Sequence, residues 1–140
     1  MKVYKSKISY GLLLLIFLIL VLPLGFGIVK TESNQSVIVS ISAFVLPFGF
    51  VLHLFFNTEY AIINNVLKIK SGFVYKKDLD IRTIKSITKS KSLISSPAAS
   101  LDRIELKYGV FSSVIISPKD TFDFIDDLIK INPNIENKIK

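Results

Sequence analysis

Two long uncharged stretches dominate the first part of the chain. Residues 8–29 and 37–56 contain no Asp, Glu, Lys or Arg, and each is about as long as the roughly 20 residues that a helix needs to cross a bilayer. Only the seven residues 30–36 separate them. The pattern predicts two transmembrane helices joined by a short polar loop. Pro23 and Pro47 lie within the predicted helices, where proline is tolerated as it is in other membrane spans.

After residue 58 the pattern changes to alternation of apolar and polar positions, which is typical of half-buried strands. Asn64-Asn65 predicts a tight hairpin turn, because asparagine tolerates the left-handed conformation that such turns need. Gly72 allows a further turn. The predicted strands cover residues 59–62, 67–70, 73–75, 81–88, 103–108 and 110–116.

The last predicted element is a helix. Ser117 is its expected cap, Pro118 fits the first helical position, and Asp120 completes a capping-box-like arrangement. Asn132-Pro133 should end the helix. We expect an apolar stripe of Phe122, Ile125, Leu128 and Ile129 with Phe124 beside it, and a solvated face of Asp123, Asp126, Asp127 and Lys130.

Short antiparallel strands closed by one amphipathic helix predict a bent sheet or partial barrel that the helix plugs. The expected organisation is an N-terminal arm with a two-span membrane anchor in residues 1–58 and a small soluble domain in residues 59–140. The predicted core consists of Ile62, Leu67, Ile69, Ile104, Leu106, Val114, Phe124, Ile125 and Leu128.

Charge predicts the orientation. The net charge of +7 divides into +3 before the first apolar stretch, 0 between the two stretches and +4 after residue 58. Because short lysine-rich segments stay in the cytoplasm, both termini should be cytoplasmic, in a multi-pass protein of the cell's inner membrane. Tyr4, Tyr10 and Tyr60 lie near the expected cytoplasmic boundaries, where aromatic rings commonly anchor. A secretory signal peptide is the less favoured alternative, since a second long apolar stretch follows the first.

Residue types that carry catalysis are scarce. The chain has no cysteine and one histidine. His53 lies near the end of the second apolar stretch, so we interpret it as a polar residue at the membrane interface rather than as a proton or ligand site. The aspartates of the C-terminal helix lack the ligand spacing of a calcium loop. We therefore expect no catalytic residue, metal or cofactor, and no nucleic-acid binding, since the basic residues alternate with acidic ones.

Four segments together resemble a known family. They are YAIINNVLKI at 60–69, IKSI at 84–87, SSPAASLDRI at 95–104 and ISPKD at 116–120. In this order they resemble the bacterial pleckstrin-homology-like (PH-like) domains of the YyaB-like type, which commonly follow a pair of membrane helices. The resemblance implies a non-enzymatic interaction or scaffolding module. Some similar small membrane proteins confer immunity to a secreted bacteriocin, so self-immunity is the alternative function.

The resemblance does not extend to inositol-phosphate binding. Eukaryotic domains of this fold that bind phosphoinositides use a basic loop between their first two strands. Here the first predicted hairpin has only Asn64-Asn65, which offers no cation to a phosphate.

Two groups of residues are candidate sites in the soluble part. Lys85, Lys89 and Lys91 could contact anionic lipid, since lysines near an anionic leaflet contribute about 1 kcal/mol each; the favoured alternative is a solvated strand edge. A protein or peptide partner is expected at the loop before the strand 103–108, because loops on rigid scaffolds often carry binding residues. The alternative is that this loop makes only local pairs and turns. Its candidate residues are Ser96, Pro97, Ser100, Asp102 and Arg103.

Overall fold

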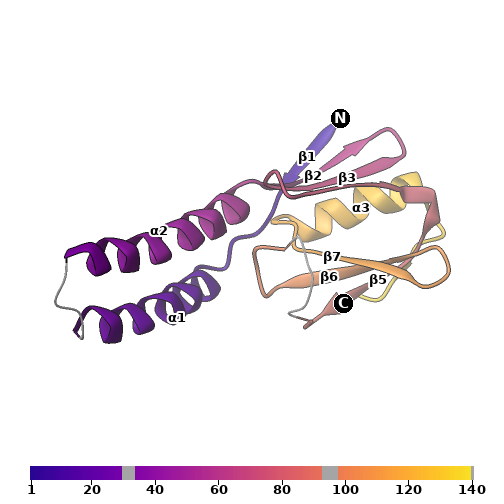
Figure 1. The fold of residues 1–140 in the computed structure, drawn as a ribbon. Coiled ribbons are helices and arrows are strands. Elements are labelled where there is room, and N and C mark those ends of the chain that lie inside the picture. Colours follow the sequence, from indigo (N-terminus) through magenta and orange to yellow (C-terminus); the bar gives the residue numbers. More distant parts are fainter. Residues whose placement is uncertain (30–33, 93–97, 140) are drawn as a thin grey trace. The chain divides into compact units, whose positions relative to one another are not determined.

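The chain folds into two compact units in the computed structural model, which describes residues 1–29, 34–92 and 98–139. The sheet unit consists of Met1–Ile8 and Leu54–Lys140, and the helical unit is Ser9–His53 (Figure 1).

Two helices form the helical unit. They are α1 (Tyr10–Val29) and α2 (Asn34–Phe56), and each continues through an internal proline. Aromatic side chains join them, since the ring centroid of Phe17 lies 5.7 Å from that of Phe44 and 5.3 Å from that of Phe48.

The helices differ in how well they match a membrane span. Within the part of the chain that the structure describes, Val37–Phe56 is the one helix long and apolar enough to cross a bilayer, and none of its apolar window is buried. Tyr10–Pro23 is a shorter apolar helix. The prediction of a first span at 8–29 is therefore not confirmed by length and hydropathy.

The first sheet has four antiparallel strands in the order β1-β2-β3-β4. Its centre is the predicted hairpin, in which Asn64 has a φ of 54°. The strand β4 begins at Tyr75, later than predicted, because Phe73 and Val74 belong to the turn after Gly72. The bounds are β1 (Lys2–Lys5), β2 (Thr58–Ile63), β3 (Val66–Ser71) and β4 (Tyr75–Asp80).

The strand β1 is the main difference from the sequence-based organisation. The N-terminal arm was assigned to the membrane anchor, whereas it pairs with β2 and belongs to the sheet unit. Tyr4 explains why: its ring lies 5.2 Å from that of Phe124, so burial of this side chain favours the paired strand. The connection between β1 and β2 is consequently the whole of residues 6–57, whereas Asn64-Asn65 connects β2 to β3 as predicted.

The second sheet has the order β7-β6-β5-β8, and only the short β8 runs parallel to its neighbour β5. The predicted strand 81–88 begins with a 3₁₀ turn, Ile81–Thr83, which Asp80 caps by accepting a hydrogen bond from the Arg82 N–H at 2.9 Å. The bounds are β5 (Ile84–Ser90), β6 (Arg103–Tyr108), β7 (Ser112–Ile116) and β8 (Glu136–Asn137).

A single apolar core joins the two sheets to the C-terminal helix. All nine predicted core residues are buried, which confirms the predicted strand faces. Tyr60 is fully buried among them, so its expected place at the membrane interface was wrong. The other large core residues are Leu79, Ile81, Ile84, Ile87, Ile116 and Ile135.

The helix α3 (Thr121–Ile131) begins four residues after its expected cap. Ser117 is fully buried and takes part in a different hydrogen-bond network. Phe122 was expected in the apolar stripe but is 69% exposed, while Asp127 was expected in solvent but is 8% exposed. Asp127 is buried because β1, which the sequence pattern did not predict, lies against this face of the helix.

Candidate functional site

A groove of about 420 Å³ lies on the sheet unit where the start of α3 meets the loop before β6. Four of its six charged residues come from separate parts of the chain: Lys7 follows β1, Lys89 lies on β5, Asp102 precedes β6, and Lys119 precedes α3. Basic and acidic side chains therefore surround one opening. The remaining lining residues are Ile104, Asp120, Thr121, Phe122, Asp123 and Ile139.

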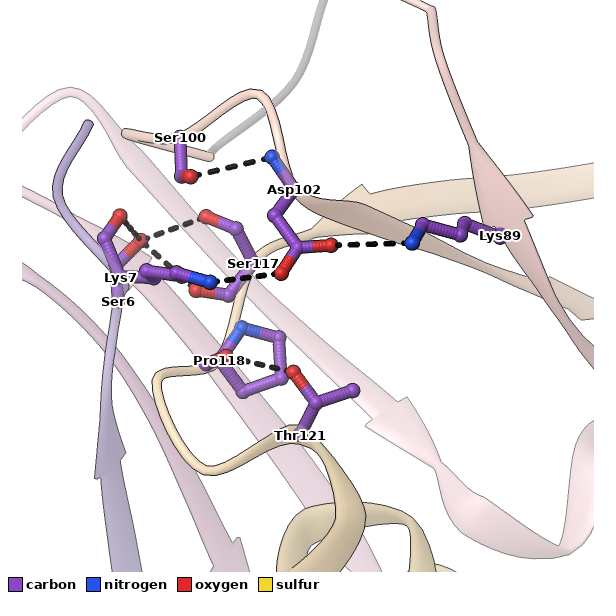
Figure 2. Close-up of polar contacts among 8 residues, drawn as sticks. All are labelled: Ser6, Lys7, Lys89, Ser100, Asp102, Ser117, Pro118 and Thr121. Atoms are coloured by element: carbon purple, nitrogen blue, oxygen red, sulfur yellow. Dashed lines mark hydrogen bonds and ion pairs between the residues drawn. The ribbon is translucent and has the colours of Figure 1, made fainter. Parts of the chain in front are cut away.

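Asp102 is the electrostatic centre of the groove (Figure 2). One carboxylate oxygen lies 2.8 Å from Lys7 Nζ and the other lies 3.9 Å from Lys89 Nζ. The hydrogen bond from Lys7 lowers the pKa of Asp102. The side chain is still 46% exposed, so the carboxylate is oriented by two lysines while it remains open to a ligand.

Arg103, the neighbour of Asp102, is buried and has a different role. Its guanidinium donates hydrogen bonds to three backbone carbonyls, those of Ser100, Ser92 (2.8 Å) and Ala98 (3.4 Å). Removal from water lowers the pKa of the guanidinium. A buried guanidinium that is bonded to three backbone carbonyls fixes the chain next to Asp102. Arg103 is thus a positioning residue for Asp102 rather than a contact for a ligand.

A buried polar network includes Ser6, the residue before Lys7. The hydroxyl groups of Ser6 and Ser117 are 2.9 Å apart, and Tyr60 OH lies 3.2 Å from Ser6 Oγ. The Ala99 N–H also donates to Ser6 Oγ, at 3.4 Å. Burial raises the pKa of Tyr60. The network joins the arm, β2, the segment after β7 and the Asp102 loop, so the position of Lys7 is tied to that of Asp102.

The predicted partner loop is only partly within the described residues. Ser96 and Pro97 lie outside them. Ser100 is 3% exposed and its Oγ accepts a hydrogen bond from the Asp102 N–H at 3.2 Å, so the local turn considered in the sequence is present. Asp102 and Arg103 do not pair with each other among the described contacts; each has the separate partners given above.

The three lysines predicted to contact lipid are spread along β5 and beyond its end. Lys89 lines the groove, whereas Lys85 lines another hollow, with Lys107 and Phe111. Lys85 and Lys89 are four positions apart on the strand, so their Cα atoms are about 13 Å apart. Lys91 follows β5 and is exposed. The structure therefore does not gather these lysines around one point, and their contact with lipid stays a prediction.

Of the ten groove residues, sequence reasoning proposed only Lys89 and Asp102 as site residues. Lys7, Lys119 and Phe122 are among those that it missed. Lys7 was used only to predict membrane orientation, and Phe122 was predicted in the apolar stripe of the C-terminal helix. Val3 and Tyr4, both residue types that favour strands, are the signal at residues 2–5 that the arm forms a strand. No local pattern shows that this strand would bring Lys7 to the loop before β6.

The comparisons with known proteins agree with this architecture. A family model described as "Bacterial PH domain" matches residues 58–132. No curated protein and no solved structure matches the chain. The matched segment runs from the first residue of β2 to the C-cap of α3, Asn132, and it covers more than half of the 140 residues. The chain therefore belongs to the bacterial PH domain family.

Proposed function

We propose that this PH-like domain is a non-catalytic interaction module held on the cytoplasmic face of the inner membrane by residues 9–53. Support comes from the outer surfaces of both helices, where large apolar side chains such as Leu22 (62%), Ile38 (64%) and Leu46 (73%) are exposed. An apolar surface of this kind is stable in lipid. The proposal includes the finer resemblance to the YyaB-like type, whose domains follow a pair of membrane helices.

The pairing of β1 with β2 is the observation that carries the proposal. The two strands lie on either side of the apolar segment in the sequence, yet they form one ladder, which the Ser6 N–H extends by donating to the Thr58 carbonyl at 3.0 Å. Two paired strands must be on the same side of a bilayer. If Val37–Phe56 crosses the membrane, the preceding residues must cross it as well. This argument supports two spans even though α1 contains a shorter apolar stretch.

The groove at Asp102 is the proposed partner site. It combines three lysines and three aspartates with the apolar side chains of Phe122, Ile104 and Ile139. A protein or peptide segment with one apolar anchor and charges of both signs fits this lining, because each charge can meet an opposite one. The site includes Lys7, which lies two residues before the helical unit begins in the sequence.

Cysteine labelling tests the topology, because the chain has no cysteine of its own. Asn34→Cys lies in the predicted external loop and should react with a membrane-impermeant maleimide in intact spheroplasts. Ser113→Cys is exposed on β7 of the sheet unit and should react only after lysis. Reaction of Ser113→Cys before lysis would refute the cytoplasmic location.

Photocrosslinking in cells tests the partner site. Benzoylphenylalanine in place of the exposed Phe122 should form an adduct with a protein partner, whereas the same replacement of the exposed Phe111 should not. Asp102→Asn should weaken the adduct. Asp78→Asn is the matched control, since Asp78 also pairs with a lysine, Lys68 at 3.7 Å, but lies away from the groove. Equal amounts of adduct at residues 122 and 111, or an unchanged amount of adduct with Asp102→Asn, would show that the groove is not the partner site.

Bacteriocin self-immunity rests on the resemblance alone. No contact among the described residues favours it over a general interaction module, so it is not part of the proposal. Deletion of the gene separates the two, because loss of an immunity protein should make the cells sensitive to their own secreted peptide.

A further inference from the structure

The outer face of the first sheet carries a row of charges at one end. The strand register aligns Lys5 of β1, Glu59 of β2, Lys70 of β3 and Lys76 of β4. Residues opposite each other in antiparallel strands point to the same face, and neighbouring strands lie about 4.8 Å apart. Lys70 Nζ lies 3.3 Å from Glu59 Oε1, and no ion pair of Lys5 or Lys76 occurs within the described ranges. Three lysines and one glutamate thus form a basic row roughly 14 Å long.

The basic character fades along the same face. The next row toward the Asn64 turn contains Lys68 and Asp78, which pair with each other at 3.7 Å. The row after that has Asp80 as its only charged side chain. The face therefore changes from basic to neutral to acidic over the length of the strands.

The basic end is the end at which the chain arrives from α2. Phe56 is the last residue of this helix, and the Asn57 carbonyl accepts a hydrogen bond from the Gly72 N–H at 2.8 Å. That bond places the turn between β3 and β4 beside the junction. The apolar side chains of this turn, Phe73 and Val74, are 70% and 61% exposed. Exposed apolar side chains beside a row of lysines are typical of surfaces that lie at a lipid interface.

We propose that Lys5, Lys70, Lys76, Phe73 and Val74 form a lipid rim that rests on the membrane surface and prefers anionic phospholipid. This inference rests on the proposed function, since it requires residues 9–53 to be in the bilayer. The lysines would meet headgroup phosphates while the turn enters the interfacial layer, and the acidic end of the face would point away from the membrane. The rim contains none of the lysines at 85, 89 and 91.

Single-tryptophan variants of the full chain test the rim, because the protein has no tryptophan. F73W and F111W are a matched pair, since both phenylalanines are exposed in hairpin turns. Phe111 is at the opposite end of the unit: the Gly109 N–H in its turn bonds to Thr83 O, and the Ile81 N–H bonds to Asn65 O. Each variant is reconstituted into brominated phosphatidylcholine vesicles, with or without phosphatidylglycerol.

We expect brominated lipid to quench F73W and shift its emission to shorter wavelength, with a stronger effect when phosphatidylglycerol is present. F111W should be quenched only by aqueous acrylamide. In the F73W background, K5Q/K76Q should abolish the response to phosphatidylglycerol. The control K85Q/K107Q removes the same charge at the other end and should keep that response.

The outcomes separate this inference from the proposed function. If the protein does not float with the vesicles, both fail. If it floats but F73W is quenched by acrylamide as strongly as F111W is, the rim is wrong while the anchor stands. Lipid quenching of F73W that does not depend on phosphatidylglycerol would refute a role of the lysine row in binding anionic lipid. Protection of F73W from acrylamide without lipid quenching would assign the turn to a protein contact instead.

Discussion

The N-terminal arm meets the rest of the sheet unit through two lysine–aspartate contacts that differ in burial. At one, Asp127 accepts from Lys2 Nζ at 2.7 Å and from Tyr4 OH at 2.5 Å, and its side chain is 10% exposed. At the other, Asp102 accepts from Lys7 Nζ at 2.8 Å, and its side chain is 46% exposed. The pairing chemistry is the same, but the surroundings are not.

Burial separates a contact that holds the fold from one that is available to a ligand. Hydrogen bonds from Lys2 and Tyr4 lower the pKa of Asp127 to about 2, and burial together with this carboxylate raises the pKa of Tyr4. An ion pair in water contributes little to stability because solvent screens it. The contact at Asp127 should therefore stabilise β1, whereas the contact at Asp102 should mainly orient charges in the groove.

Leu128→Asp should have the largest effect, since it places an unpaired charge in the core. Leu128 is fully buried, and we expect a loss of more than about 4 kcal/mol and an unfolded sheet unit. Near-ultraviolet circular dichroism of the tyrosines in the detergent-solubilised full chain measures it. Phe122→Asp on the same helix is the control and should leave the melting curve almost unchanged. An unaltered melting temperature for Leu128→Asp would contradict the core assignment.

Asp127→Ala should come next, because it removes the acceptor shared by Lys2, Tyr4 and Lys130. Charged hydrogen bonds of this kind suggest a loss of about 2 kcal/mol, which lowers the melting temperature by roughly 8 °C or more. Asp126→Ala removes a neighbouring exposed carboxylate and serves as the control. If the two variants melt alike, the buried contact does not hold β1.

Lowering the pH should reduce the stabilisation by Asp127 without removing its side chain. The pKa of Asp127 falls from an ordinary 3.8 to about 2 in the fold, so its ionised form stabilises the native state at neutral pH. That contribution is complete above about pH 4 and is lost as the pH falls toward 2. Wild type should thus exceed Asp127→Asn in melting temperature at pH 7, and the gap should narrow below pH 4. A gap that stays constant down to pH 2 would disprove the linkage.

Asp102→Asn should have the smallest effect on stability. Both partners of its ion pair are about half exposed, so we expect a change below about 1 kcal/mol. Added salt should erase this small difference, because it screens exposed charges. A loss as large as that of Asp127→Ala would show that the groove residue is structural, and the comparison between the two contacts would fail.

Local pattern was enough to predict the elements whose partners are close in sequence. The bounds of β6 were predicted as found, and so was the turn at Asn64, because alternation and turn chemistry act over a few residues. Asn132 ends α3 as expected. The nine core residues were identified for the same reason: each side chain's periodicity indicates its face.

Elements that depend on distant partners were missed. The strand β1 has only four residues. It forms because it pairs with β2, which follows the helical unit in the sequence. Without β1, the sequence could not predict that Asp127 is buried or that Lys7 pairs with Asp102. The burial of Arg103 was also missed, because its partners are backbone carbonyls of a loop and no residue type signals them.

The insertion of the helical unit between β1 and β2 also sets an order of events during synthesis. The arm leaves the ribosome first, but its partner strand follows only after both apolar helices have been made. The hairpin of β2 and β3 has a two-residue connection and can form early, since short loops close at little entropic cost. The arm can pair only after β2 has been made, so β1 is added to a sheet that has already begun to form. Completion of this ladder thus requires that the two ends of the segment between the strands meet.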